Sequence, residues 1–173
     1  MQDEIINKVA LNQSLITLDL EEFIPKDADI IAFDIEPFLF MGMILKEKDF
    51  RESLKDHDWS VYKDKVVNVF CSADAIIPMW AYMLISSYLT PVTANVFYGS
   101  KEQAQNDMFF RNLNHIRLED YEGKKLILKG CSNLIEKERA YLTATSIFLP
   151  VVNSLMFGEA CSTVPIYKVK RAV

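Results

Sequence analysis

The sequence predicts a three-layer α/β fold, with a mostly parallel sheet, helices on both faces and added strands near the N-terminus. Short apolar, β-branched runs alternate along the chain with longer segments of helical length, which is typical of parallel α/β proteins. Half of the 173 residues are hydrophobic, enough to bury a sizeable core. We recognise no internal repeat, low-complexity tract or Gly/Ser-rich linker. One domain over residues 1–173 is therefore expected.

The first third of the chain is predicted to form a helix, three strands and a charged helix. Leu15–Leu20 alternates apolar and polar residues, as a half-buried strand does. Gly42 is expected to mark a bulge within the third strand. In chain order the predicted ranges are Met1–Gln13, Leu15–Leu20, Ile30–Ile35, Phe38–Leu45 and Lys46–Asp56.

From residue 64 onward strands and helices alternate, which indicates parallel strands joined by right-handed crossovers. Ser100 is a suitable cap for the helix that follows it. Pro150 either kinks a helix that continues to Gly158 or ends that helix before a strand at Val151–Phe157, and the glycine favours the kink. Pro165 predicts an edge position for the last strand, because proline donates no ladder hydrogen bond. The predicted ranges are Val66–Phe70, Ala75–Leu89, Val92–Tyr98, Ser100–His115, Leu126–Lys129, Glu136–Leu149 and Val164–Lys170.

Composition excludes several classes of function. A formal net charge of −5 does not predict a nucleic-acid surface. No apolar run has the length of a membrane span, and the acidic start of the chain does not resemble a signal peptide. Three Cys in a chain of this length do not suggest a disulfide scaffold. We therefore expect a cytoplasmic protein with free thiols that binds neither nucleic acid nor membrane.

The familiar catalytic motifs are absent from the sequence. It contains no glycine-rich phosphate loop, no GxSxG nucleophile elbow, no HExxH and no CxxC. Only two His are present, which excludes His-rich metal sites and most His-based triads. Catalytic residues therefore stay unknown, and an enzyme is not the favoured interpretation.

Three cysteines, each followed by Ser, form the candidate site: Cys71, Cys131 and Cys161. Cys71 and Cys131 come just after predicted strands, at the start of the next predicted helix, where a helix N-terminus would favour the thiolate. The carboxyl ends of parallel strands meet at one sheet edge, so we expect these thiols there, with Cys161 if its loop folds back. Three thiolates would suit zinc or an iron–sulfur cluster. The alternative is that each thiol is a buried core residue and each Ser a helix cap.

His57 is the fourth candidate metal ligand. It lies between Asp56 and Asp58, whose carboxylates would orient its ring and favour its charged form. Either it completes the metal site or acts as a general base, or it caps the preceding helix, where a cationic ring favours the dipole. Asp74 or an outside molecule is an alternative fourth ligand.

Several phrases of the sequence resemble one bacterial family, found mostly in Bacteroidetes: LKEKDFR at 45–51, HDW at 57–59, CSADAIIPMWAYM at 71–83, KGCS at 129–132 and GEACSTVPIYK at 158–168. The family is the domain-of-unknown-function family DUF2480, and the resemblance covers nearly the whole chain. It implies a single-domain cytoplasmic protein without an assigned activity, whose genes tend to lie beside those for iron–sulfur cluster assembly. The family pattern includes Cys71, Cys131, Cys161 and His57. Iron–sulfur assembly proteins are therefore the partners that the resemblance implies.

Three hypotheses for the function follow. The first is an accessory protein that handles iron–sulfur clusters or metal through a site of three cysteine thiolates. The second is a non-catalytic interaction protein, such as a homodimeric scaffold, whose cysteines are structural. The third is a thiol enzyme that uses Cys71 as its nucleophile.

Overall fold

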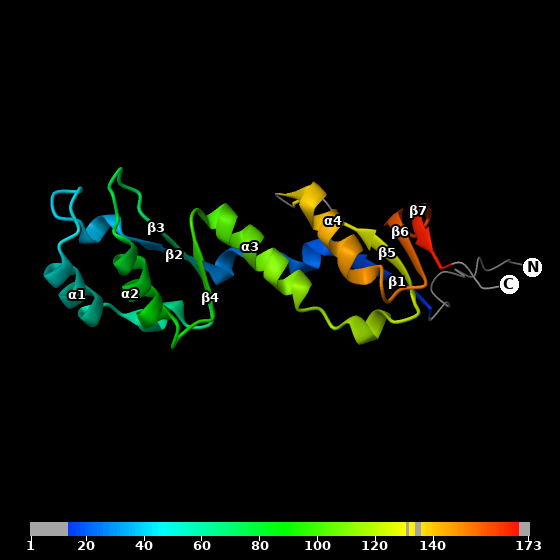
Figure 1. The fold of residues 1–173 in the computed structure, drawn as a ribbon, viewed down its shortest axis with the longest axis horizontal. Helices are drawn as coiled ribbons and strands as arrows, with labels where there is room; N and C mark the ends of the chain where they lie inside the picture. The colour runs from blue at the N-terminus through cyan, green and yellow to red at the C-terminus, as the bar shows by residue number, and fades with distance from the viewer. Residues whose placement is uncertain (1–13, 131, 134–135, 170–173) are drawn as a thin grey trace, which may run out of the picture. The chain divides into compact units, whose positions relative to one another are not determined.

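The computed structural model describes residues 14–130, 132–133 and 136–169, so the predicted helix Met1–Gln13 lies outside the described residues. The chain forms two compact units. The middle unit comprises residues 25–109, and the terminal unit comprises residues 1–24 and 110–173. One unit contains a parallel sheet and the other a mostly parallel sheet, each accompanied by helices, so the predicted α/β class is confirmed, with two sheets rather than one (Figure 1). The expectation that the chain is one domain stays a prediction.

The middle unit has a parallel sheet of three strands in the order β2-β3-β4. Val67 and Val69 of β3 join the core cluster that contains the buried residues of helices α1 and α2. Val66 instead packs with Ala104 of helix α3. Since successive side chains of a strand point to opposite faces, helices cover both faces of this sheet. The elements are β2 (Ile30–Asp34), α1 (Glu47–Asp56), β3 (Val66–Phe70), α2 (Met79–Leu89), β4 (Asn95–Tyr98) and α3 (Lys101–Asn114), of which residues 110–114 belong to the terminal unit.

The terminal unit has a sheet of four strands in the order β1-β5-β6-β7. The first three strands are parallel, and β7 runs antiparallel to β6. The strand that contains Pro165 is at the edge of the sheet, as predicted, and the ladder has a bulge next to that residue. The elements are β1 (Leu15–Asp19), β5 (Lys125–Lys129), α4 (Lys137–Phe148), β6 (Ser154–Glu159) and β7 (Ser162–Lys168).

Short 3-10 helices connect these elements. One of them, Glu36–Phe38, ends at the residue where a strand at Phe38–Leu45 was expected to begin, and the prediction of that strand is wrong. The chain instead makes a tight turn in which Phe40 and Ile44 pair, with Gly42 at a φ of 70°. The others are Leu20–Phe23, Asp27–Asp29, Trp59–Tyr62 and Leu118–Tyr121.

Two helix boundaries also differ from the prediction. Helix α2 begins at Met79 rather than Ala75, directly after Pro78. Helix α4 ends at Phe148, and β6 follows, so a kinked helix that continues to Gly158 is wrong. Ser100 does cap α3: its Oγ accepts a hydrogen bond from the backbone N–H of Gln103, whose side chain accepts one from the Ser100 N–H.

The two units share an internal repeat that the sequence analysis did not recognise. Strands β3 and β5 begin at residues 66 and 125, and strands β4 and β6 begin at residues 95 and 154, a spacing of 59 residues in both cases. The buried residues of the intervening helices have the same spacing: Ala81, Ile85 and Leu89 in α2, and Ala140, Ala144 and Phe148 in α4.

The repeat extends to the details of the backbone and the rings. Gly99, directly after β4, and Gly158, the second-last residue of β6, occupy equivalent positions and have φ angles of 113° and 118°. Tyr82 and Tyr98 pack edge to face with ring centroids 5.7 Å apart, and the equivalent Tyr141 and Phe157 do so at 5.2 Å. The two β-α-β segments therefore have the same local design with few identical residues.

Candidate functional site

The carboxyl ends of β2, β3 and β4 lie at one edge of the middle unit, because the three strands are parallel. Asp34 ends β2, and its Oδ1 accepts hydrogen bonds from the backbone N–H groups of Glu36 and Ser72, each 3.0 Å long. One carboxylate therefore ties the turn after β3 to the end of β2. Burial raises the pKa of Asp34, but hydrogen bonds from Ser72 and Glu36 outweigh this effect and hold the pKa below its usual value.

Cys71 directly follows β3 at this edge. Its side chain is half-buried and packs against the core of the middle unit. Burial, with smaller effects of the nearby Tyr98 and Cys71 side chains, raises the pKa of Tyr82. The thiol of Cys71 was expected at a helix N-terminus. It does not lie there, because helix α2 begins at Met79, eight residues after Cys71.

Large apolar side chains are exposed after the carboxyl ends of these same strands. Ile76 is 94% exposed, Met83 is 73% exposed and Tyr98 is 71% exposed. Met79, Tyr82 and Tyr98 line a shallow hollow beside β4. We call the exposed members of this group the apolar edge surface: Met41, Met43, Ile44, Ile76, Met79, Met83 and Tyr98.

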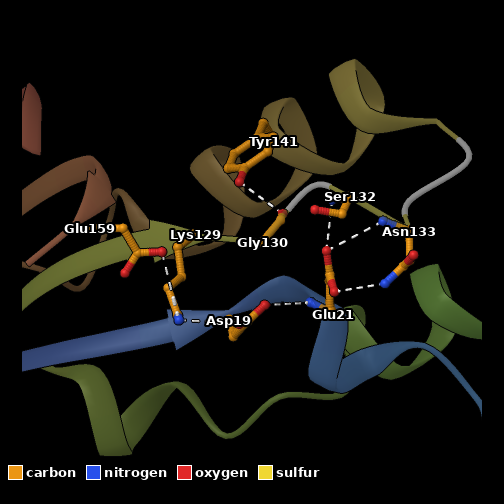
Figure 2. A network of polar contacts seen from close by, with 8 residues as sticks. All are labelled: Asp19, Glu21, Lys129, Gly130, Ser132, Asn133, Tyr141 and Glu159. Atoms are coloured by element: carbon orange, nitrogen blue, oxygen red, sulfur yellow. Dashed lines mark hydrogen bonds and ion pairs between the residues drawn. The ribbon is translucent and has the colours of Figure 1, made fainter.

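In the terminal unit, Glu21 holds the turn that follows β5 (Figure 2). Its Oε1 accepts hydrogen bonds from the backbone N–H groups of Ser132, at 2.7 Å, and Asn133, at 3.3 Å. Its Oε2 accepts a third from the Asn133 side chain at 3.0 Å. Asp19 in turn accepts a hydrogen bond from the Glu21 N–H at 3.0 Å. A carboxylate from the 3-10 helix that follows β1 thus holds the turn after β5, whereas in the middle unit the corresponding carboxylate, Asp34, is the last residue of β2 itself.

Lys129 brings together the ends of three strands at this edge (Figure 2). Its Nζ lies 3.4 Å from Asp19 Oδ2 and 3.8 Å from Glu159 Oε1. Cys161 is exposed in the turn after β6, and β6 runs parallel to β5, so this thiol lies at the same edge. Cys131 follows β5 in the sequence but lies outside the described residues.

Cys71 and Cys131 were expected at the edge of one sheet. They instead follow strands of different sheets, because β3 belongs to the middle sheet and β5 to the terminal sheet. Among the described residues, no three His, Cys, Asp or Glu side chains are grouped so that they could hold a metal ion. A metal site formed by Cys71, Cys131, Cys161 and His57 stays a prediction, since one of its members is not described.

His57 lies in an aromatic cluster of the middle unit. Its Nε2 is 3.1 Å from the hydroxyl of Tyr62, and its ring packs edge-on against Trp59 and Phe33, with centroids 4.8 and 5.5 Å away. It follows the last residue of α1, as expected for a cap position. These contacts give the ring a packing partner on several sides.

Asp34, Glu21 and the apolar edge surface were not predicted from the sequence. A signal for Asp34 was present, because β1 and β2 both end in Asp and the strands that pair with them are followed by Cys-Ser; no such pattern pointed to Glu21, which lies two residues beyond the end of β1. The apolar edge surface gave no such signal, because its residues also suit a core. In the described part of the chain, no helix has the length and apolar character that crossing a bilayer requires.

Comparison with known proteins places the chain in one family. A family model described as "Protein of unknown function (DUF2480)" matches residues 3–169. No curated protein and no solved structure matches the chain.

Proposed function

Because the chain belongs to the DUF2480 family of proteins of unknown function, we propose its function from its own surfaces: it is an interaction protein that binds another polypeptide through the apolar edge surface. The observation that supports this proposal is the exposure of Ile76, Met79, Met83 and Tyr98 around one sheet edge. Exposed apolar groups gathered in this way mark binding surfaces, since covering them removes unfavourable contact with water.

The side-chain types also suit protein recognition. Methionine is flexible and polarizable, so it adapts to a partner surface, and tyrosine combines an apolar ring with a polar tip. Met79, Tyr82 and Tyr98 form a hollow with almost no polar lining, in which a partner side chain fits. The Asp34 hydrogen bonds hold the start of the turn after β3 in place, which lowers the cost of ordering this turn on binding.

Photo-crosslinking in cells tests this function. A photoreactive residue replaces Met83 of α2, and in the matched control it replaces Leu142, the equivalent residue of α4, which is 71% exposed. We expect crosslinked adducts from position 83, and we expect Ile76→Glu or Met79→Glu to remove them. The same adducts from both positions, or adducts that survive both charged substitutions, would contradict the proposal.

The second candidate function is metal or iron–sulfur handling by thiolates of the terminal unit. The observation that favours it is the position of Cys161 in the turn after β6, beside the end of the strand that precedes Cys131. Thiolates from Cys161 and Cys131, with ligands from a partner iron–sulfur protein, would suit zinc or a cluster in transit. In this version Cys71 is a packing residue.

Metal content tests the second candidate. The protein is purified without oxygen, loaded with zinc or reconstituted with iron and sulfide, and its metal content and absorption spectrum are measured. The thiolate function predicts that Cys161→Ser and Cys131→Ser each lower the metal content strongly, whereas Cys71→Ser leaves it unchanged. A wild-type protein that retains neither zinc nor iron would eliminate this candidate.

A further inference from the structure

The internal repeat reveals a difference between the two sheets. Strand β6 in the terminal unit pairs with β5 on one side and with β7 on the other. Its equivalent β4 in the middle unit pairs with β3, and no strand in the described part of the chain pairs with its other edge. After Glu159, the last residue of β6, the chain turns back as β7, whereas after β4 it enters helix α3. The middle unit therefore lacks the counterpart of β7.

The open edge of β4 presents backbone hydrogen-bonding groups. The N–H of Gly99 donates to the carbonyl of Val69 in β3. Because backbone groups alternate in direction along a strand, the N–H and C=O groups of Phe97 also point toward β3, and those of Val96 and Tyr98 point to the open edge. Unpaired edges of this kind readily pair with a strand from another chain.

The pairing of β6 with β7 indicates which side chains such a strand should carry. Phe157 lies opposite Val164, and Leu155 lies opposite Tyr167. Each cross-strand pair thus joins an aromatic ring to a branched aliphatic side chain, a favourable combination in sheets. In addition, Ile166 of β7 lines the hollow that contains the Tyr141–Phe157 ring pair.

Strand β4 can provide the same pairs to a copy of itself. In β4 the residues equivalent to Leu155 and Phe157 are Val96 and Tyr98. When two β4 strands pair antiparallel with Phe97 opposite Phe97, Val96 of each lies opposite Tyr98 of the other. The backbone N–H and C=O groups of Val96 and Tyr98, which point to the open edge, then form hydrogen bonds with those of the other copy. A two-fold axis perpendicular to the sheet, midway between the two β4 strands, makes these strands antiparallel by symmetry.

We propose that two copies of this chain join through β4 into a continuous sheet in the order β2-β3-β4-β4-β3-β2. This dimer rests on the proposed interaction function and makes a second copy of the chain its partner. The second copy takes the place that β7 has in the terminal unit. Tyr98 gains the aliphatic partner that Phe157 has in Val164. The hollow formed by Met79, Tyr82 and Tyr98 is then covered by the second copy.

Molar mass measured by light scattering tests this dimer with a proline variant. Val96→Pro removes an N–H that points to the open edge and leaves the ladder with β3 intact, because an edge strand tolerates proline at such a position. We expect wild-type protein at twice 19.9 kDa and Val96→Pro at 19.9 kDa. The matched control is Ala32→Pro in β2, an exposed residue whose N–H also points away from β3, and it should stay dimeric. A monomeric wild type, or a dimer unaffected by Val96→Pro, would overturn the proposal.

Disulfide crosslinking gives a second, independent result if the proline variant does not fold. Phe97→Cys is made in a chain whose three native cysteines are replaced by Ser. Directly opposed residues that are not hydrogen-bonded to each other have Cα atoms about 4.5 Å apart, within the range of a disulfide. Mild oxidation should link two chains of the Phe97→Cys variant through a disulfide, whereas the Ala32→Cys variant should form no disulfide-linked dimer. If wild type is monomeric but position 83 crosslinks to a different protein, the dimer is refuted and the interaction function stands; without adducts, both are refuted.

Discussion

His57 offers a sharp test of whether a predicted metal ligand is in fact a packing residue. Replacing it with Ala removes the contact between Nε2 and the Tyr62 hydroxyl, worth about 1 kcal/mol. It also removes the edge-on contacts with Trp59 and Phe33, worth about 0.5 to 1 kcal/mol each. We therefore expect His57→Ala to lower the free energy of unfolding by about 2 to 3 kcal/mol, and His57→Phe, which keeps a ring, to lower it by about 1 kcal/mol.

Urea unfolding at neutral pH, followed by tryptophan fluorescence, measures these differences. The control is His115→Ala, because His115 is exposed and the hydrogen bond of its ring to the Arg111 carbonyl lies at the surface. It should cost less than 1 kcal/mol. A His57→Ala variant with unchanged stability but reduced zinc or iron content would refute the packing role and return His57 to the metal site.

Three other predictions follow from the same structure. Asp34→Asn should lower stability by about 1 kcal/mol at pH 7; because the folded pKa of Asp34 is lowered, this difference is present above the unfolded value of 3.8 and shrinks as pH falls below it, as urea titrations at several pH values can show. Gly158→Ala should cost about 2 to 4 kcal/mol, since its Cβ would lie 2.6 Å from the Ser162 carbonyl oxygen, whereas at Gly99 a Cβ meets only the Gln103 side chain, so Gly99→Ala should cost about 1 to 2 kcal/mol in the same assay. Fluorescence from the two tryptophans of the middle unit and circular dichroism of the whole chain should report one unfolding transition if the chain is a single domain; two separate midpoints would contradict that expectation.

Most of the elements could be predicted from local sequence patterns. Short β-branched runs such as Val66–Phe70 indicated the parallel strands, and Pro165 indicated the edge strand. The division into two sheets could not be predicted, because strand partners far apart in the sequence are chosen by tertiary packing. Pro150 was misinterpreted as a kink, although its equivalent Pro91 also follows the last turn of a helix and precedes a strand.

The candidate site was less accessible to sequence reasoning. The three Cys-Ser pairs drew attention to the turns after β3, β5 and β6, and these turns do lie at carboxyl edges of parallel strands. The repeat was missed because Gly130 shifts Cys131 by one residue relative to Cys71, and because few residues in the two segments are identical. The apolar edge surface needed coordinates, since a methionine on a helix has the same sequence signature whether it faces a core or water.

Hydrogen exchange at the amides of Val96 and Tyr98 tests most directly whether a second chain occupies the open edge of the middle sheet. The proposed dimer predicts slow exchange of both amides in concentrated protein and faster exchange on dilution, while the amide of Phe97, bonded within the sheet, changes little. Fast exchange of Val96 and Tyr98 that does not depend on concentration would show that this edge stays open.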